Sequence, residues 1–214
     1  MEQLNLQAYI QNPCRASSLP YWKTKTISVP ADMLIVHDEQ YQACRFEEYD
    51  DERYFRLQHD LKDLQKPNLP YGYSIVRATA CEYANHINAC YSDLSVTEEL
   101  ISSYANHAVY AENLWVAVAD IETSGIVASG IAEYDSEARE GALEWVQVME
   151  AYRRKGLGQF IVKELLWRMR ELAAFATVSG KVDNKTSPEQ LYRKCGFIGA
   201  DLWHILRRRG RVIN

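Results

Sequence analysis

Residues 144–159 read EWVQVMEAYRRKGLGQ and are the most informative stretch of the sequence. Alternating apolar residues up to Val148 predict a β-strand, and the amphipathic pattern from Gly156 to about Ala173 predicts an α-helix. Between the two lies a short loop that is rich in basic residues and leads into the glycines. A strand that passes through such a loop into a helix can bind an anion at the helix N-terminus.

The loop is suited to a pyrophosphate for three reasons. Gly156 and Gly158 leave backbone N–H groups free to turn toward a ligand. The helix N-terminus contributes about half a positive charge, and Arg153, Arg154 and Lys155 add full charges at the same place. An ordinary turn is the alternative. The spacing is neither the Gly-x-x-x-x-Gly-Lys-Ser/Thr of a P-loop nor the Gly-x-Gly-x-x-Gly of a dinucleotide site.

Strands and helices also follow one another through the rest of the chain after residue 73. Strands are predicted at 74–78, 114–119, 125–134, 143–148, 175–178 and 197–206, and helices at 81–93, 96–109, 156–173 and 187–196. Ser187, Pro188 and Gln190 have the pattern of a capping box, and Gly196 suits the left-handed residue after a helix. The predicted fold class is α/β (α+β).

The N-terminal part of the chain is harder to interpret. Short strands are predicted at 26–29 and 33–36, whereas Tyr54, Leu57, Leu61 and Leu64 recur at helical spacing. Residues 66–72 contain two prolines and a glycine, which favours a connector. We therefore predict an N-terminal extension of unknown role over 1–72 and a second, functional domain over 73–214.

Several motifs in the second part resemble those of the GNAT superfamily of acyl-CoA-dependent N-acetyltransferases. They are Arg153-x-x-Gly156-x-Gly158, the strand Val146-Gln147-Val148, and Asn184 followed by LYRKCGF at 191–197. The resemblance covers roughly residues 73–208. It implies an N-acetyltransferase domain with a mixed, mostly antiparallel twisted sheet flanked by helices, and acetyl-CoA as the cosubstrate.

Carried over by position, the resemblance also implies roles for individual residues. Val146, Gln147 and Val148 would hold the pantetheine arm through their backbone. The pyrophosphate and the rest of CoA would be surrounded by Arg153, Arg154, Lys155, Gly156, Leu157, Gly158, Gln159 and Asn184. Tyr192 matches the tyrosine that commonly protonates the departing thiolate, a transfer that a phenol can perform; a tyrosine that only packs against CoA is the alternative.

Glu144 is the first candidate for the base that deprotonates the amine. It would lie on the same face of its strand as Val146 and Val148 if the alternation holds. A structural or substrate-orienting carboxylate is the alternative role. Some family members have a glutamate shortly before the asparagine of the second motif, but residues 179–183 contain none, so a water chain is a further candidate for the base.

Charge is distributed unevenly along the chain, whose net charge is −5. Residues 1–149 carry 10 Lys/Arg and 23 Asp/Glu, whereas residues 150–214 carry 14 and 6. The basic end suits a polyanionic cofactor, and the acidic part suggests a small cationic primary amine as acceptor, attacked directly in a ternary complex. A protein or peptide amine acetyltransferase, a non-catalytic CoA-binding module and an interaction protein are the alternatives.

Composition also excludes several classes of protein. The negative net charge argues against a nucleic-acid binder, and no apolar run is long enough for a membrane span. Five widely spaced cysteines without a Cys-x-x-Cys pair argue against disulfides and structural zinc, so we expect no metal and a cytoplasmic location. A homodimer is left open.

Overall fold

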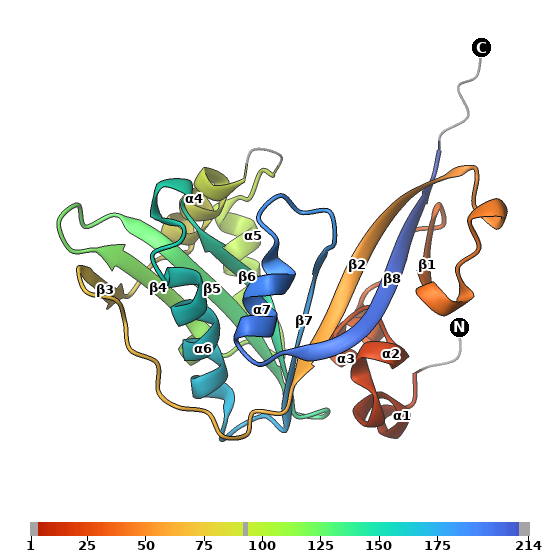
Figure 1. Cartoon of the computed structure of the whole chain (residues 1–214), viewed down its shortest axis with the longest axis horizontal. Helices are drawn as coiled ribbons and strands as arrows, with labels where there is room; N and C mark the ends of the chain where they lie inside the picture. The colour runs from red at the N-terminus through yellow and green to blue at the C-terminus, as the bar shows by residue number, and fades with distance from the viewer. Residues whose placement is uncertain (1–3, 92–93, 210–214) are drawn as a thin grey trace, which may run out of the picture.

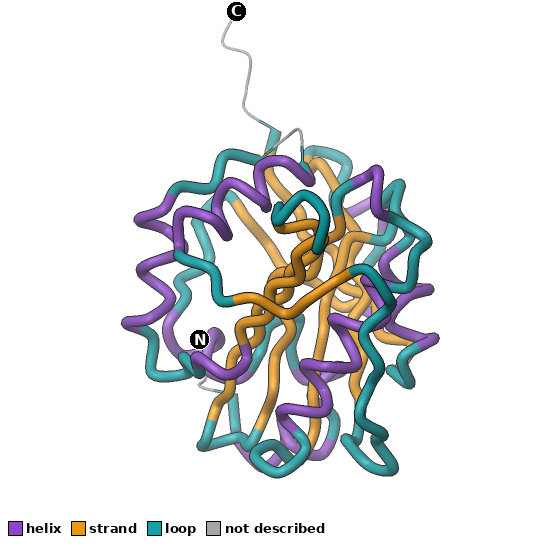
Figure 2. Tube along the Cα trace, turned by 90° about the vertical axis from the view of Figure 1, so that its left-hand side faces the viewer, coloured by secondary structure: helices purple, strands orange, loops and turns teal. Residues whose placement is uncertain are grey.

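The computed structural model describes residues 4–91 and 94–209, which form an eight-stranded sheet with helices on both faces (Figures 1 and 2). The strand order is β1-β8-β2-β7-β6-β5-β4-β3, and of these pairs only β6–β7 is parallel. The strands are β1 (Met33–His37), β2 (Tyr49–His59), β3 (Tyr73–Val76), β4 (Trp115–Asp120), β5 (Ile126–Asp135), β6 (Glu140–Val148), β7 (Phe175–Lys181) and β8 (Ile198–Arg208). The expected mixed, mostly antiparallel sheet flanked by helices is confirmed.

The helices cover the two faces of the sheet unequally. They are α1 (Leu6–Gln11), α2 (Pro13–Ala16), α3 (Tyr21–Thr26), α4 (Ala80–Cys90), α5 (Glu98–Ser103), α6 (Leu157–Met169) and α7 (Pro188–Lys194). Helices α6 and α7 pack on one face over the main core, and α4 and α5 enclose a smaller core on the other. No helix in the described parts of the chain is long and apolar enough to cross a bilayer.

Helix α6 lies close to β5 and β6 because two strand residues lack side chains. A Cβ at Gly130 would overlap Ile161, and one at Gly141 would overlap Met169. The apolar face of α6 is buried, as its amphipathic pattern predicts. Close packing of this helix fixes the position of its N-terminus relative to the end of β6.

Strand β2 brings the N-terminal part of the chain into the middle of the sheet. It pairs with β7 along one edge and with β8 along the other. Helical spacing at Tyr54, Leu57 and Leu61 was therefore misleading: Phe55 and Leu57 alternate toward the main core, as strand residues do. The division at residue 72 stays a prediction, but the sheet itself is continuous across it.

A buried ion pair ties β2 to β6 and to the first helix. Arg56 Nη2 donates to Glu140 Oε1 at 3.2 Å and to the Tyr9 hydroxyl at 2.8 Å. Thr177 Oγ1 donates to Glu140 Oε1 at 2.5 Å, and the Tyr21 amide donates to Glu140 Oε2 at 2.9 Å. The Arg56 and Glu140 side chains are each 1% exposed. Segments far apart in the sequence therefore share one buried polar cluster.

Several local predictions differ from the structure. Residues 21–26 form α3, so the strand predicted at 26–29 is wrong. Ser187 has a left-handed backbone with φ of 49° and its side chain caps nothing, so the capping box is wrong although Pro188 does open α7. Gly196 has the predicted left-handed backbone, with φ of 97°. The helix expected at 81–93 ends at Cys90, and its last two positions lie outside the described residues.

Candidate functional site

Strands β6 and β7 pair over a short distance and then separate. Their parallel pairing runs from Glu140 opposite Phe175 to Leu143 opposite Val178. Beyond Leu143, β6 continues beside β5 alone, and β7 continues beside β2. Figure 1 shows the two strands parting, with α7 in front of the place where they do so. Within the described residues, no strand pairs with the β7-facing edge of 144–148, whose backbone can therefore hydrogen-bond an extended ligand.

A β-bulge lies at the point of separation. Ile131 of β5 lies opposite Trp145, but its neighbour Ala132 lies opposite Leu143, so Glu144 is the extra residue. Trp145 packs with Ile131 in the smaller core. Leu143 belongs to the main core beneath α6. The bulge therefore places two consecutive side chains, Glu144 and Trp145, on the face away from α6.

This bulge corrects one prediction about Glu144. Val146 and Val148 pack against the main core on the α6 face, whereas Glu144 contacts Lys23 of α3 and Glu133 on the opposite face. The expectation that Glu144 shares a face with the two valines is wrong, because the extra residue interrupts the alternation.

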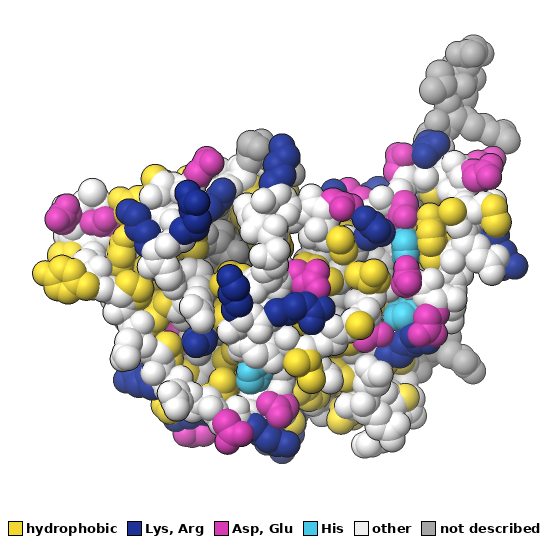
Figure 3. Space-filling view, viewed as in Figure 1, with side chains coloured by type: hydrophobic (Ala, Val, Ile, Leu, Met, Phe, Trp, Pro, Cys, Tyr) yellow, Lys and Arg dark blue, Asp and Glu magenta, His cyan; other side chains and the backbone are white. Residues whose placement is uncertain are grey.

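The basic loop ends at the N-terminus of α6. Gly156 and Arg154 have left-handed backbones, with φ of 84° and 61°. No side chain of the described residues caps the helix, so its first backbone N–H groups are available to a ligand. Arg154 and Lys155 are exposed, and Arg153 Nε donates to the Val148 carbonyl at 3.2 Å. Figure 3 shows Lys and Arg side chains gathered around this end of α6, which suits a polyanion.

The remaining residues of the loop motif differ in what they can contact. Leu157 is buried in the main core, whereas Gln159 is exposed. Gly158 is at a close contact between elements, since a Cβ there would lie 3.2 Å from Leu191 Cδ2 of α7 and 3.6 Å from Val148 Cγ2. Leu157 can therefore offer a ligand its backbone but not its side chain.

Asn184, Gln147 and Tyr192 lie in three different surroundings. Asn184 Oδ1 accepts from the Thr186 amide at 2.9 Å, which holds the turn before α7. Gln147 Nε2 donates to Ser129 Oγ at 2.5 Å, and Gln147 Oε1 is buried without a partner among the described residues. The Tyr192 ring packs against aromatic residues of β2 and the segment before β8. Burial raises the pKa of Tyr192, so its hydroxyl keeps its proton at neutral pH.

A cluster that the sequence did not suggest surrounds Glu144. Lys23 Nζ lies 2.5 Å from Glu144 Oε2, and both side chains are 15% exposed. Glu133, 3% exposed, accepts from Trp22 Nε1 at 3.0 Å and lies 3.4 Å from His107 Nδ1. Burial and the nearby Glu144 carboxylate raise the pKa of Glu133 to about 8. In the sequence, Glu133 within the otherwise apolar run of β5 was the one local sign of this cluster.

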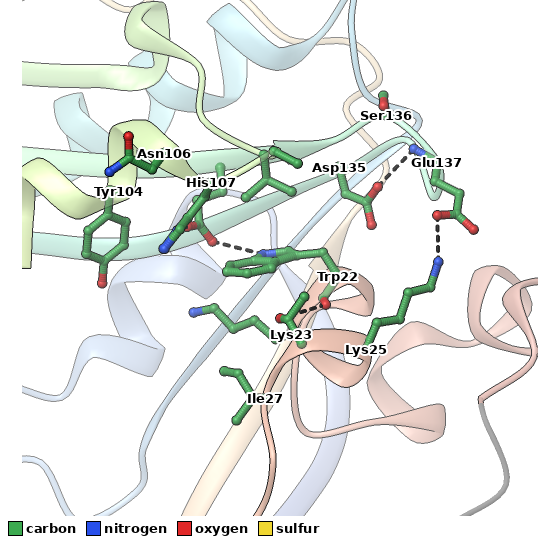
Figure 4. A pocket seen from close by; sticks show the side chains of 14 residues that line it. Trp22, Lys23, Lys25, Ile27, Tyr104, Asn106, His107, Asp135, Ser136 and Glu137 are labelled. Atoms are coloured by element: carbon green, nitrogen blue, oxygen red, sulfur yellow. Dashed lines mark hydrogen bonds and ion pairs between the residues drawn. The ribbon is translucent and has the colours of Figure 1, made fainter.

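A cavity of about 730 Å³ opens beside this cluster (Figure 4). Its walls come from α3, from the 3-10 turn Tyr104–Asn106 with the residues after it, and from the end of β5. Trp22, Lys23, Tyr104, His107 and Glu133 line it. Tyr104 also accepts a hydrogen bond from Trp145 Nε1 at 3.0 Å, so one wall residue of the cavity contacts the bulge.

Comparisons with known proteins agree with this geometry. Residues 110–198 match the family model of the acetyltransferase (GNAT) domain. A search of curated proteins finds no match. A GCN5-related N-acetyltransferase from Sphaerobacter thermophilus superposes with a TM-score of 0.67 and 16% identity, over 95% of this chain and 66% of its own.

Two further solved structures have the same fold. An acetyltransferase of the GNAT family from Colwellia psychrerythraea gives a TM-score of 0.57 at 12% identity, over 82% of this chain and 64% of its own. A tandem GNAT protein from the clavulanic acid biosynthesis pathway gives 0.56 at 16% identity, over 77% of this chain and 56% of its own. The chain thus spans about two thirds of these proteins or less.

Proposed function

We propose that this protein, whose residues 110–198 match the model of the acetyltransferase (GNAT) domain, is an N-acetyltransferase that moves an acetyl group from acetyl-CoA to a primary amine. The observation that carries the proposal is the separation of β6 from β7 at Glu144, directly before the uncapped N-terminus of α6. The unpaired strand edge is followed along the chain by a polar, positively charged helix end. An extended cofactor with a pyrophosphate requires both features.

The residues at this place fit acetyl-CoA, which would supply the acetyl group as a thioester. The free edge of β6 at Val146–Val148 would hydrogen-bond the pantetheine arm. Backbone N–H groups of Gly156–Gln159 and the side chains of Arg153, Arg154 and Lys155 would bind the pyrophosphate. Asn184, in the turn before α7, would lie near the same molecule.

Two carboxylates are suited to accept the proton of the acceptor ammonium. Glu144 stands at the bulge, and Glu133 has a pKa raised to about 8 by burial and by Glu144. A base whose pKa is near the working pH transfers protons efficiently. We assign the first contact with the ammonium to Glu144 and the uptake of its proton to the pair. Tyr192, which stays protonated, would donate to the departing thiolate.

The acceptor that suits these surroundings is a small cationic primary amine. Glu133, Asp135 and Glu137 line the cavity beside the Glu144 cluster, and carboxylates attract an ammonium. The amine would attack the thioester directly, without an acyl-enzyme intermediate.

All five cysteines are free thiols, which fits a reducing cytoplasm.

Calorimetry with acetyl-CoA, followed by an assay of thiol release with a panel of amines, tests this proposal. Binding of acetyl-CoA together with turnover of cationic primary amines is the expected result. Binding without turnover on any amine would identify a non-catalytic CoA-binding module instead. An enzyme that prefers neutral or acidic acceptors would contradict the assignment of a cationic substrate.

A further inference from the structure

Lys23 both lines the cavity and contacts the bulge. It belongs to α3, in the N-terminal part of the chain, and its side chain lines the cavity of Figure 4. Its ammonium ends 2.5 Å from Glu144 Oε2. Burial alone would lower the pKa of Lys23, but the nearby carboxylates Glu144 and Glu133 raise this pKa above its usual value. The ammonium is therefore charged and paired with Glu144, one of the two carboxylates that the proposed reaction uses.

The place of this ammonium matches the place that an acceptor must reach. Glu144 is the extra residue of the bulge, where β6 leaves β7 and the edge available to an extended ligand begins. A substrate amine attacking beside this edge needs a carboxylate within hydrogen-bond distance. Glu144 already has such a partner, and that partner is itself a primary amine at the end of an unbranched alkyl chain.

We propose that Lys23 occupies the acceptor position and that the substrate, a primary amine on an unbranched alkyl chain, binds by displacing it from Glu144. The inference rests on the proposed function and names its substrate class. The cavity supplies the route, because Lys23, Tyr104 and Glu133 line it and each of them contacts the bulge residues. The walls formed by the Trp22, Tyr104 and His107 rings suit an alkyl chain more than a strongly hydrated one.

Competition of this kind lowers the apparent affinity for the acceptor. If the site is open to substrate for a fraction of the time, the apparent dissociation constant is the intrinsic one divided by that fraction. A lysine that holds the site nine tenths of the time would raise the KM about tenfold. Removing the ammonium while keeping the apolar stem should therefore improve binding of the external amine.

Lys23→Met is the direct test, with n-butylamine as the acceptor and Lys25→Met as the matched comparison. Lys25 is on the same helix and lines the same cavity, but its ammonium pairs with Glu137, 2.5 Å away, rather than with Glu144. We expect Lys23→Met to lower the KM for n-butylamine about tenfold with the KM for acetyl-CoA changed less than about twofold. Lys25→Met should change the KM for the amine less than Lys23→Met does.

Thermal stabilisation by n-butylammonium alone gives a readout that needs no turnover. The amine should raise the Tm of Lys23→Met more than that of the unaltered protein, because a ligand stabilises the state it binds. Lys23→Gln, which can still hydrogen-bond Glu144, repeats the experiment if the methionine variant does not fold. Acetyl-CoA binding without turnover by any of these proteins would contradict the proposed function, while the Tm difference would still test the position of Lys23.

Two results would overturn the inference. A KM for n-butylamine that is unchanged or higher in Lys23→Met would mean that Lys23 orients Glu144 instead of competing with substrate. Equal changes of the KM for n-butylamine in Lys23→Met and Lys25→Met would mean that the loss of any positive charge from the cavity has the same effect. Turnover by the unaltered protein in either case would leave the proposed function standing.

Discussion

Replacement of Arg56 by methionine tests whether the N-terminal part of the chain is integral to the fold. The Arg56 guanidinium and the Glu140 carboxylate are each 1% exposed, and no solvent can replace the lost partner. Removing one member of a buried ion pair costs about 3–5 kcal/mol, because the other charge remains buried and unpaired. For a chain of this size, about 2–4 °C per kcal/mol predicts a Tm lower by roughly 6–20 °C.

Two further variants should each cost less free energy than Arg56→Met. Tyr9→Phe removes a hydroxyl that hydrogen-bonds Arg56 at 2.8 Å and Glu140 at 2.7 Å, and bonds to charged groups of this kind are worth about 1.5–3 kcal/mol. Arg53→Met is the matched control. Arg53 is on the same strand, but its ion pair with Asp183 is exposed and should contribute less than about 1 kcal/mol.

Urea unfolding gives the free energy of each variant, and a thermal scan gives its Tm. A double variant, Arg56→Met with Glu140→Gln, should cost less than the sum of the two single changes, because it leaves no unpaired buried charge. A loss below about 1 kcal/mol for Arg56→Met, similar to that of Arg53→Met, would mean that the buried ion pair does not hold β2 and α1 to the sheet.

Three further predictions concern the candidate site. The pKa of Glu133 is raised to about 8, so its carboxylate forms, and kcat/KM for the amine should rise, as the pH rises through that value. Glu133→Gln should lose this rise when thiol release is followed from about pH 6 to 9, whereas an unchanged pH profile would exclude Glu133 from proton transfer. Arg154→Ala should raise the KM for acetyl-CoA about tenfold at low salt, and less at high salt where charges are screened; an effect on the KM for the amine instead would contradict its assignment. Tyr192→Phe should lower kcat about 100-fold with little change in KM, whereas an unchanged kcat would mean that Tyr192 only packs.

The elements that the sequence predicted well are those whose signal is local. Helix α6 carries its whole amphipathic pattern within itself, and the basic loop before it is continuous in the sequence. Strand β2 carries no such signal, because both of its partners come more than a hundred residues later. Leu57 and Leu61 fell at helical spacing by coincidence: Leu57 is a strand residue facing the core, and Leu61 has a left-handed backbone with φ of 58°.

The residues of the candidate site likewise differ in whether their place could be predicted from the neighbouring sequence. Arg153 to Gly158 could be found from spacing, since a loop and the helix that follows it are neighbours in the chain. The orientation of Glu144 could not be found, because the bulge depends on the register between β5 and β6. Lys23 lies 121 residues before Glu144 in the sequence, and its role follows from the three-dimensional structure alone.

The position of β2 between β7 and β8 has a consequence for how the chain folds during its synthesis. Arg56 leaves the ribosome 123 residues before Ser179, the β7 residue that it contacts. At about 5–20 residues per second, its partners follow about 6–25 s later. Throughout this interval the apolar face of β2 has neither neighbouring strand with which to pair. Completion of the sheet must therefore be one of the last steps of folding, and chaperones that shield unpaired strands would act on residues 49–59.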